Sequence, residues 1–293
     1  MKTRILLLGL AGASAALLSA APLTQSTFTA VIRDVNVVAE PTKAAAPAKV
    51  NELFQSPDLI RTGADSRAEL TAPDQTITRI GANTVFSFAP SGRDINLEQG
   101  SILFHSPKGK GGGTIKSGGA SAAVLGTTLI VATTPVTSPT DKNGFKVILL
   151  EGKGRVTLGN GKHRNLKAGQ MVFVLPGQGN FSPVLNINLA KLVGGSNLVK
   201  GFGHTLPSLT LIEAAIQQQQ NDLAKGNVQD TGAPADAFGP WGNIPAVGYT
   251  GIDPNTYQIG ILFPVVKSNP PVGNVPPPGP GTGLVTGPPK FAP

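Results

Sequence analysis

Cysteine is absent from this sequence of 293 residues, and aromatic and charged residues are scarce. Without cysteine the chain has no disulfide, no catalytic thiol, no cysteine-ligated zinc and no lipid-modified N-terminal cysteine. Aromatic residues make up 5% of the chain and charged residues 14%, whereas glycine (37) and proline (26) are abundant. This composition indicates much turn-dense or irregular structure. The protein must therefore be stabilised by its hydrophobic core alone, which a module of about a hundred residues or more can supply.

Residues that carry catalysis are few, and no catalytic set is visible among them. Asp94 and Glu98 alternate onto one side of a predicted strand and superficially suggest a glycosidase pair, but a solvated strand face explains them more simply. No serine lies in a Gly-x-Ser-x-Gly elbow, and no histidine has a ligand partner at metal-binding spacing. The residues concerned are Ser101, Ser117, Ser121, His105, His163 and His204. We therefore expect no enzyme, no catalytic residue, no cofactor and no metal site.

The N-terminus has the form of a targeting segment. Lys2 and Arg4 precede an uncharged run from residue 5 to residue 20, and small residues follow at the end of that run. The run is shorter than the ~20 residues that span a bilayer, and no later run is long enough. We predict a cleaved signal peptide over residues 1–21, with a retained membrane anchor as the alternative. The mature protein is then periplasmic or secreted and has no transmembrane span.

Residues 28–176 predict an all-β domain. Short alternating or β-branched segments follow one another, and turn residues separate them. Asn160-Gly161 is a hairpin signal between two of these segments, and Ala122–Thr133 is expected to form the most apolar strand. Many short strands of this kind are typical of a β-solenoid-like or a sandwich-like module, and the sequence leaves both open.

The remainder of the chain is expected to be a linker with one or two short helices, followed by a Pro/Gly-rich tail. Within residues 177–226, Thr210 and Glu213 have capping-box spacing, and Gly226 lies just past the end of the predicted helix. That amphipathic helix docks on its own domain or binds a partner. Residues 227–293 hold fourteen of the twenty-six prolines and read as a flexible or extended tail.

Positive charge is concentrated in one part of the β domain. Ten lysines and arginines lie between Gly100 and Gln170 against only Asp141 and Glu151, which accounts for the whole net charge of +8. Alternation on hairpin strands can place several of them on one face. We expect this face to bind an anionic partner, with a merely soluble basic face as the alternative. The candidate residues are Lys153, Arg155, Lys162, Arg164 and Lys167.

Several segments, in order, resemble the FecR domain, an all-β periplasmic module. They are Arg61–Leu70, Arg79–Thr84, Leu97–Phe104, Pro107–Gly109, Ala120–Thr128, Leu150–Gly152 with Arg155-Val156, and Leu166–Met171. The family takes its name from a regulator with a cytoplasmic segment and a transmembrane helix ahead of the β module. This sequence shows neither, so the resemblance implies the fold and the compartment rather than anti-sigma activity. At Asp74-Gln75 the family usually has Asp-Gly, so the turn is built without glycine or Gln75 avoids positive φ.

These observations favour a non-catalytic interaction module of the cell envelope. Its expected partner is an envelope protein or an acidic polymer, and we do not expect nucleic acid, because aromatic residues are scarce near the basic cluster. Two alternatives remain: a structural or surface-assembly protein that uses its tail and helix, and an envelope signalling component.

Overall fold

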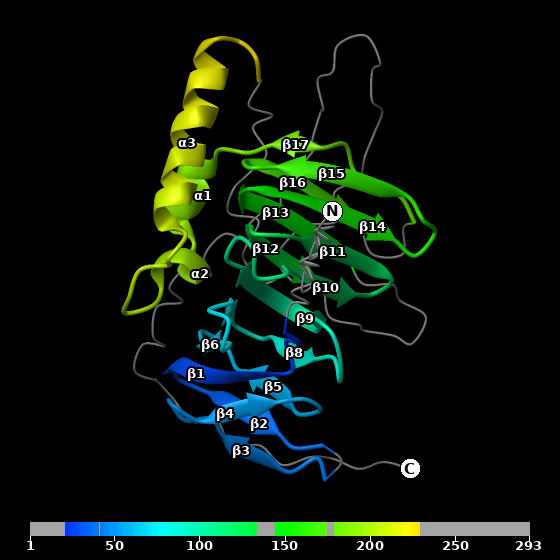
Figure 1. Ribbon diagram of the computed structural model, residues 1–293, viewed down its shortest axis with the longest axis vertical. Helices are drawn as coiled ribbons and strands as arrows, with labels where there is room; N and C mark the ends of the chain where they lie inside the picture. Colours follow the sequence, from blue (N-terminus) through cyan, green and yellow to red (C-terminus); the bar gives the residue numbers. More distant parts are fainter. Residues whose placement is uncertain (1–20, 41, 134–143, 175–178, 229–293) are drawn as a thin grey trace, which may run out of the picture. The chain divides into compact units, whose positions relative to one another are not determined.

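The computed structural model describes residues 21–40, 42–133, 144–174 and 179–228, all of which fall in the unit Met1–Ile244. The predicted signal peptide and Pro/Gly-rich tail lie almost wholly outside the described residues. Within them the expected all-β fold is confirmed: seventeen strands pair into two sheets that share one strand (Figure 1).

The shared strand is β9 (Asp94–His105). Its first half pairs with β8 and β10, and its second half pairs with β7 and β12 in the other sheet. The β9–β10 pairing is parallel, and every other described pairing is antiparallel. The change of sheet occurs near Gly100, where φ is +89° and where a Cβ would collide with Thr84.

Sheet A holds nine strands. In spatial order they are β4 (Leu53–Gln55), β1 (Gln25–Ile32), β6 (Arg67–Thr71), β7 (Ile77–Ile80), β9, β12 (Thr128–Thr133), β13 (Phe145–Glu151), β16 (Gln170–Val174) and β17 (Leu185–Asn186). Sheet B also holds nine, which are β3 (Ala45–Pro47), β2 (Val35–Val38), β5 (Leu59–Thr62), β8 (Val85–Phe88), β9, β10 (Gly113–Ser117), β11 (Ala120–Val124), β14 (Lys153–Leu158) and β15 (His163–Lys167).

The two sheets enclose one hydrophobic core, as in a sandwich. Successive side chains along each strand point to opposite faces of the sheet, so Val156 and Leu158 of β14 point inward while their neighbours point outward. Phe54 of sheet A packs on Phe86 and Phe88 of sheet B, with ring centroids 6.1 and 5.4 Å apart. Six of the nine phenylalanines in the described ranges belong to this core, where each removes a large apolar area from water.

The expected single strand Ala122–Thr133 is instead two strands in different sheets. β11 ends at Val124 in sheet B and β12 begins at Thr128 in sheet A. Gly126 makes the crossing with φ of +62°, and a Cβ there would lie 3.0 Å from the Lys108 Cα. An L-residue would be strained in this left-handed conformation and would also be too close to its neighbour.

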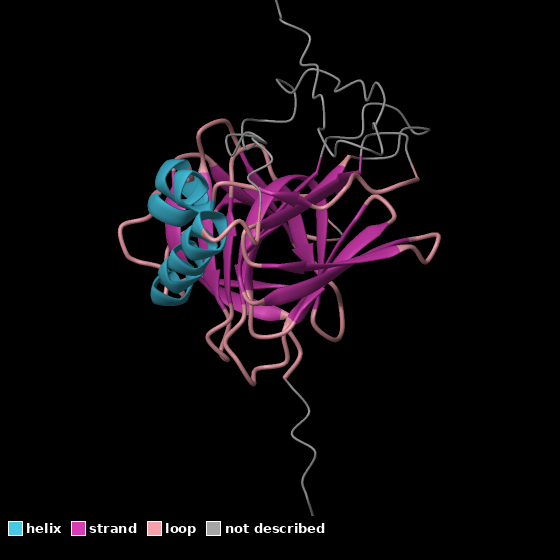
Figure 2. Ribbon diagram, turned by 90° about the horizontal axis from the view of Figure 1, so that it is seen from above, coloured by secondary structure: helices cyan, strands magenta, loops and turns pink. Residues whose placement is uncertain are grey.

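Three helices follow the sheets: α1 (Leu189–Gly195), α2 (Asn197–Lys200) and α3 (Leu209–Ala224). They lie along the outer face of sheet A (Figure 2), where α2 contacts β9 and α3 contacts β13. Buried residues of sheet A that point away from the sandwich core form a second apolar layer with the helices. The layer includes Leu103, Ile130 and Ile148 of the sheet and Leu192, Val199 and Ile212 of the helices. No helix in the described ranges is long and apolar enough to cross a membrane.

The start of α3 differs from the expected capping box. The N-cap is Ser208, two residues before Thr210, and its side chain caps no backbone N–H. Its hydroxyl instead lies 2.8 Å from the Thr128 hydroxyl of sheet A. A tertiary contact therefore replaces the local cap at this helix.

Candidate functional site

The outer face of sheet B carries three of the five cations singled out from the sequence. Lys153 and Arg155 of β14 and Lys167 of β15 are exposed and point away from the core, because the alternate residues Val156 and Leu166 point into it. We call these three residues the basic strip. The described residues offer none of them a carboxylate within ion-pair distance, in contrast to Lys116, whose Nζ lies 2.6 Å from Asp94 Oδ2.

Lys153 and Lys167 face one another directly across the β14–β15 pair. The Leu158 N–H donates to the Lys162 carbonyl (2.9 Å), so Leu158/Lys162 is a hydrogen-bonded pair, and every second pair along this ladder is one too. Lys153/Lys167 therefore falls on a non-hydrogen-bonded position, where Cα atoms lie only about 4.5 Å apart and side chains are closest. Like charges directly opposite each other destabilise a sheet. A bound anion would remove that cost.

Arg155 is the best oriented of the three cations. Its Nε donates to Oδ1 of Asn165, the residue directly opposite on β15, at 3.1 Å. That bond fixes one edge of the planar guanidinium. The Nη1 and Nη2 edge has no partner among the described residues and is open to solvent. The basic strip thus presents two ammonium groups and one oriented fork of N–H donors.

The structure does not bring the other two predicted cations to this strip. Arg164 lies opposite Val156, on the inward-facing side of β15, and its Cζ lies 5.5 Å from the centre of the Phe181 ring. Lys162 lies in the β14–β15 connection, where its Nζ donates to Asn180 Oδ1 at 2.7 Å. Both side chains therefore contact residues at the edge of the domain and do not lie on the outer face of sheet B.

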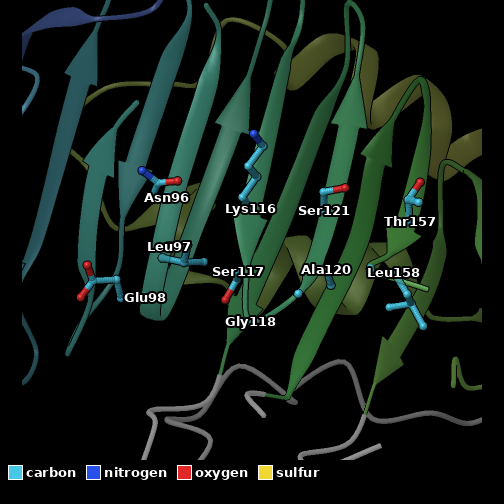
Figure 3. A pocket seen from close by; sticks show the side chains of 12 residues that line it. Asn96, Leu97, Glu98, Lys116, Ser117, Gly118, Ala120, Ser121, Thr157 and Leu158 are labelled. Atoms are coloured by element: carbon cyan, nitrogen blue, oxygen red, sulfur yellow. The ribbon is translucent and has the colours of Figure 1, made fainter. Parts of the chain in front are cut away.

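The rest of this face is nearly neutral and made of small side chains. Asn96, Lys116, Ser121 and Thr157 form a row across β9, β10, β11 and β14 (Figure 3). The row borders a shallow groove of about 750 Å³ at the end of sheet B, and the β10–β11 turn forms another part of its lining. No histidine lines this groove, and its one carboxylate is that of Glu98. The groove can bind through polar contacts, but it has no nucleophile paired with a base.

The outer face of sheet A holds a buried ion pair. Arg79 Nε donates to Glu69 Oε2 at 2.7 Å, and the two side chains are 0% and 1% exposed. Burial raises the pKa of the Glu69 carboxyl, but the hydrogen bonds from Thr29, Arg79 and His204 and the charge of Arg79 outweigh it, so this pKa lies below its usual range. Glu69 is therefore ionised at neutral pH.

The same arginine fastens the helical layer to the sheet. Its Nη1 donates to the carbonyls of Leu198 (3.1 Å) and Val199 (2.7 Å), and its Nη2 donates to the carbonyl of His204 (3.2 Å). The guanidinium also lies 4.4 Å from the centre of the Phe202 ring. Four of the five N–H donors of Arg79 bind groups of this chain, and the side chains of the pair are buried, so the pair is a structural anchor and is closed to a ligand.

A second buried polar group centres on Thr128. Its hydroxyl donates to Glu151 Oε1 (2.8 Å) and shares further hydrogen bonds with His105 Nδ1 (2.9 Å) and Ser208 Oγ (2.8 Å). Burial lowers the pKa of His105, and it raises the pKa of Glu151 although the Thr128 hydrogen bond and the charge of Lys108 oppose that shift. The set has the residue types of a catalytic triad, but Thr128 is 0% exposed and a substrate has no access to it.

Neither buried group was singled out from the sequence. Glu69 and Arg79 occupy alternating positions that are typical of a solvated strand face, and the segment that covers them follows more than a hundred residues later. His105 is buried as well. Across the described ranges no three His, Cys, Asp or Glu residues gather as a metal site would require.

Comparison with known proteins supports the resemblance that the sequence suggested. Residues 58–153 match the model of the FecR protein family. Two crystal structures, at 1.65 and 2.50 Å, of a candidate anti-sigma factor from Parabacteroides distasonis ATCC 8503 are similar to this chain, with 20% and 19% identity and TM-scores of 0.37 and 0.36. Each comparison covers 44% of this chain and 59% of the other, so the chain spans little more than half of that protein. A search of curated proteins finds no match. The match to the FecR protein family thus runs from Asp58, the residue before β5, to Lys153, the first residue of β14.

Proposed function

We propose that this protein is a non-catalytic module of the cell envelope that binds an anionic partner, a polymer or an acidic protein surface, through the basic strip. The observation that carries the proposal is the direct pairing of Lys153 with Lys167 on an open sheet face, without a carboxylate among the described residues to neutralise them. The pairing of two lysines does not stabilise the fold, whereas an anion that bridges the two ammonium groups is attracted by both charges.

The two outer faces of the sandwich differ in a way that supports this assignment. The helices cover the outer face of sheet A and leave the outer face of sheet B exposed or half-buried. The basic strip therefore lies on the face that a partner can reach. Attachment through α3, which a surface-assembly role requires, has less support, because Ile212 of that helix is already buried against its own domain.

The proposal is tested by titrating the full-length protein with two labelled polyanions, polyglutamate and polyphosphate, and following fluorescence anisotropy. The variant K153E/K167E reverses two charges on the basic strip, and K200E/K225E makes the same change of net charge on the helical layer. We expect K153E/K167E to bind at least about tenfold more weakly, because a charge-assisted contact contributes about 1.5–3 kcal/mol, and K200E/K225E to bind nearly as the parent protein does. An equal loss of affinity in both variants would show that only the net charge matters and would refute a binding site at the basic strip.

The compartment is tested separately. A cleaved signal peptide predicts that the protein recovered from cells lacks about the first 21 residues and fractionates outside the cytoplasm. N-terminal sequencing of the recovered protein decides this, and an intact Lys2 on cytoplasmic protein would contradict the envelope assignment.

A further inference from the structure

Resting on the proposed function, we infer that the basic strip recognises a phosphoryl group, and that Asn165 is the residue that positions Arg155 to do so. The inference comes from the pairing of Arg155 with Asn165 beside the two lysines. It assigns a chemical class to the ligand and a role to an uncharged residue.

The Asn165 side chain determines which edge of the guanidinium is available. Arginine has five N–H donors in a fixed plane, and the Nε–H of Arg155 is occupied by the Asn165 Oδ1. The four remaining N–H groups lie on Nη1 and Nη2, and their common edge suits two oxygens of one anion. An exposed arginine without such a bond would lose side-chain rotamer entropy when it binds an anion. The bond to Asn165 already restricts the rotamers of Arg155, so less entropy is lost on binding.

The lysines extend the site in a second direction. Lys153 is two residues from Arg155 on β14, so their Cα atoms lie about 6.6–6.8 Å apart on the same face. Lys167 lies directly across from Lys153 on the neighbouring strand. The three cations therefore form a triangle whose side chains can converge above the sheet.

A phosphoryl group fits this triangle better than a carboxylate does. A carboxylate is planar, carries one charge and is satisfied by the arginine fork alone. A phosphoryl group carries up to two charges, and it has three non-bridging oxygens at a chain end and two within a chain. Oxygens therefore remain for the ammonium groups after the group has bound the arginine fork. The described residues around the strip place no carboxylate close enough to compete by an ion pair; Asp222 of α3 lines the same small hollow of about 170 Å³ as Lys167 but forms no ion pair with it.

The test uses the full-length protein, isothermal titration calorimetry and two small anions of similar charge, inorganic tripolyphosphate and 1,2,3,4-butanetetracarboxylate. Variant N165A keeps every charge and removes the positioning bond, R155K keeps the charge and removes the fork, and N96A changes an asparagine of the same face four strands away. We expect the parent protein to prefer tripolyphosphate. N165A and R155K should each weaken its binding about five- to tenfold, as expected for loss of a bidentate charge-assisted contact, while N96A binds as the parent does.

Each alternative outcome has a defined meaning. If N165A and R155K bind tripolyphosphate as the parent does while K153E/K167E binds polyanions weakly, the positioning role of Asn165 is refuted and the proposed function stands. If butanetetracarboxylate binds as tightly as tripolyphosphate, the phosphoryl assignment is refuted. If the parent protein binds neither small anion nor either polymer, both proposals fail together.

Discussion

The substitution Arg79→Met makes the sharpest prediction about how this fold is held together. It removes one member of an ion pair whose side chains are 0% and 1% exposed and leaves the Glu69 carboxylate buried without its cation. Removal of one partner of a buried pair typically costs about 3–5 kcal/mol. The carbonyls of Leu198, Val199 and His204 lose their donor as well. The expected loss is therefore a large share of the ~5–15 kcal/mol by which a domain is typically stable.

The assay is urea unfolding followed by circular dichroism, combined with amide hydrogen exchange over residues 197–206. Arg67→Met is the matched control, because Arg67 donates a single hydrogen bond, from Nε to the Gly201 carbonyl at 3.2 Å, and is only part-buried. We expect about 0.5–1.5 kcal/mol for Arg67→Met. In Arg79→Met we also expect exchange in the covering segment to rise before global unfolding, because that segment loses its anchor.

The double variant E69M/R79M separates an unpaired charge from lost contacts. It replaces both charges by apolar side chains of similar length, so no buried charge remains without a partner. We expect it to be more stable than Arg79→Met alone. A loss of less than about 1 kcal/mol in Arg79→Met, or a double variant no more stable than Arg79→Met, would refute this reasoning.

Three further predictions concern other buried or strained groups. Burial lowers the pKa of Lys146 to about 7, so between about pH 7 and pH 10 the unfolded chain binds a proton that the folded chain does not. The free energy of unfolding should therefore rise over that range by up to about 4 kcal/mol. Urea midpoints should be flat in K146M, and a rise that persists in K146M would show that another group causes it. Thr128→Val should cost about 1–3 kcal/mol, because it leaves Glu151, His105 and Ser208 without their shared hydroxyl, whereas Thr114→Val on the outer face of sheet B should change the midpoint little. Gln75 has φ of +69° in the β6–β7 turn. Gln75→Gly should therefore raise the melting temperature slightly, and Gln75→Val should lower it by the equivalent of about 1 kcal/mol or more. Equal melting temperatures for both variants would show that the turn carries no strain.

Local pattern accounts for the strands well and for their assembly poorly. Alternation marks which residues of β14 face the core, because that depends only on the pleat of one strand. The division of Ala122–Thr133 between two sheets depends on pairing partners distant in the sequence. A glycine within an apolar run, such as Gly126, is compatible with a bulge and with a change of sheet, and the two look alike in the sequence.

The candidate site shows the same limit, because one residue in the turn decides which cations share a face. A two-residue turn at Asn160-Gly161 would place Gly159 opposite Lys162, Lys167 opposite Gly154 and Arg164 on the outward-facing side of β15. In the structure the connection has three residues, 159–161, so Leu158 lies opposite Lys162 and Lys167 lies opposite Lys153. Nor does any local signal connect Arg79 to a helix more than a hundred residues later, since both positions of the ion pair look like a solvated strand face.

At Gln75 two conformations of the turn are compatible with the sequence, and the structure distinguishes them. The turn is built without glycine, and the glutamine adopts the positive φ that glycine would have taken. Its N–H donates to the Ala72 carbonyl at 2.9 Å, and Asp74 Oδ1 accepts from the Thr76 N–H. These two bonds keep the turn closed in spite of the unfavourable conformation.

The salt dependence of polyphosphate binding tests the central claim most directly. If the basic strip binds an anionic partner, the affinity of the full-length protein falls steeply between about 50 and 200 mM salt, and the logarithmic slope becomes shallower by about one for each cation removed from the strip. K153E/K167E should therefore bind more weakly and with a markedly flatter slope, whereas K200E/K225E should retain the parent slope. A parent protein whose affinity does not change with salt, or equal slopes in the parent protein and K153E/K167E, would contradict the account.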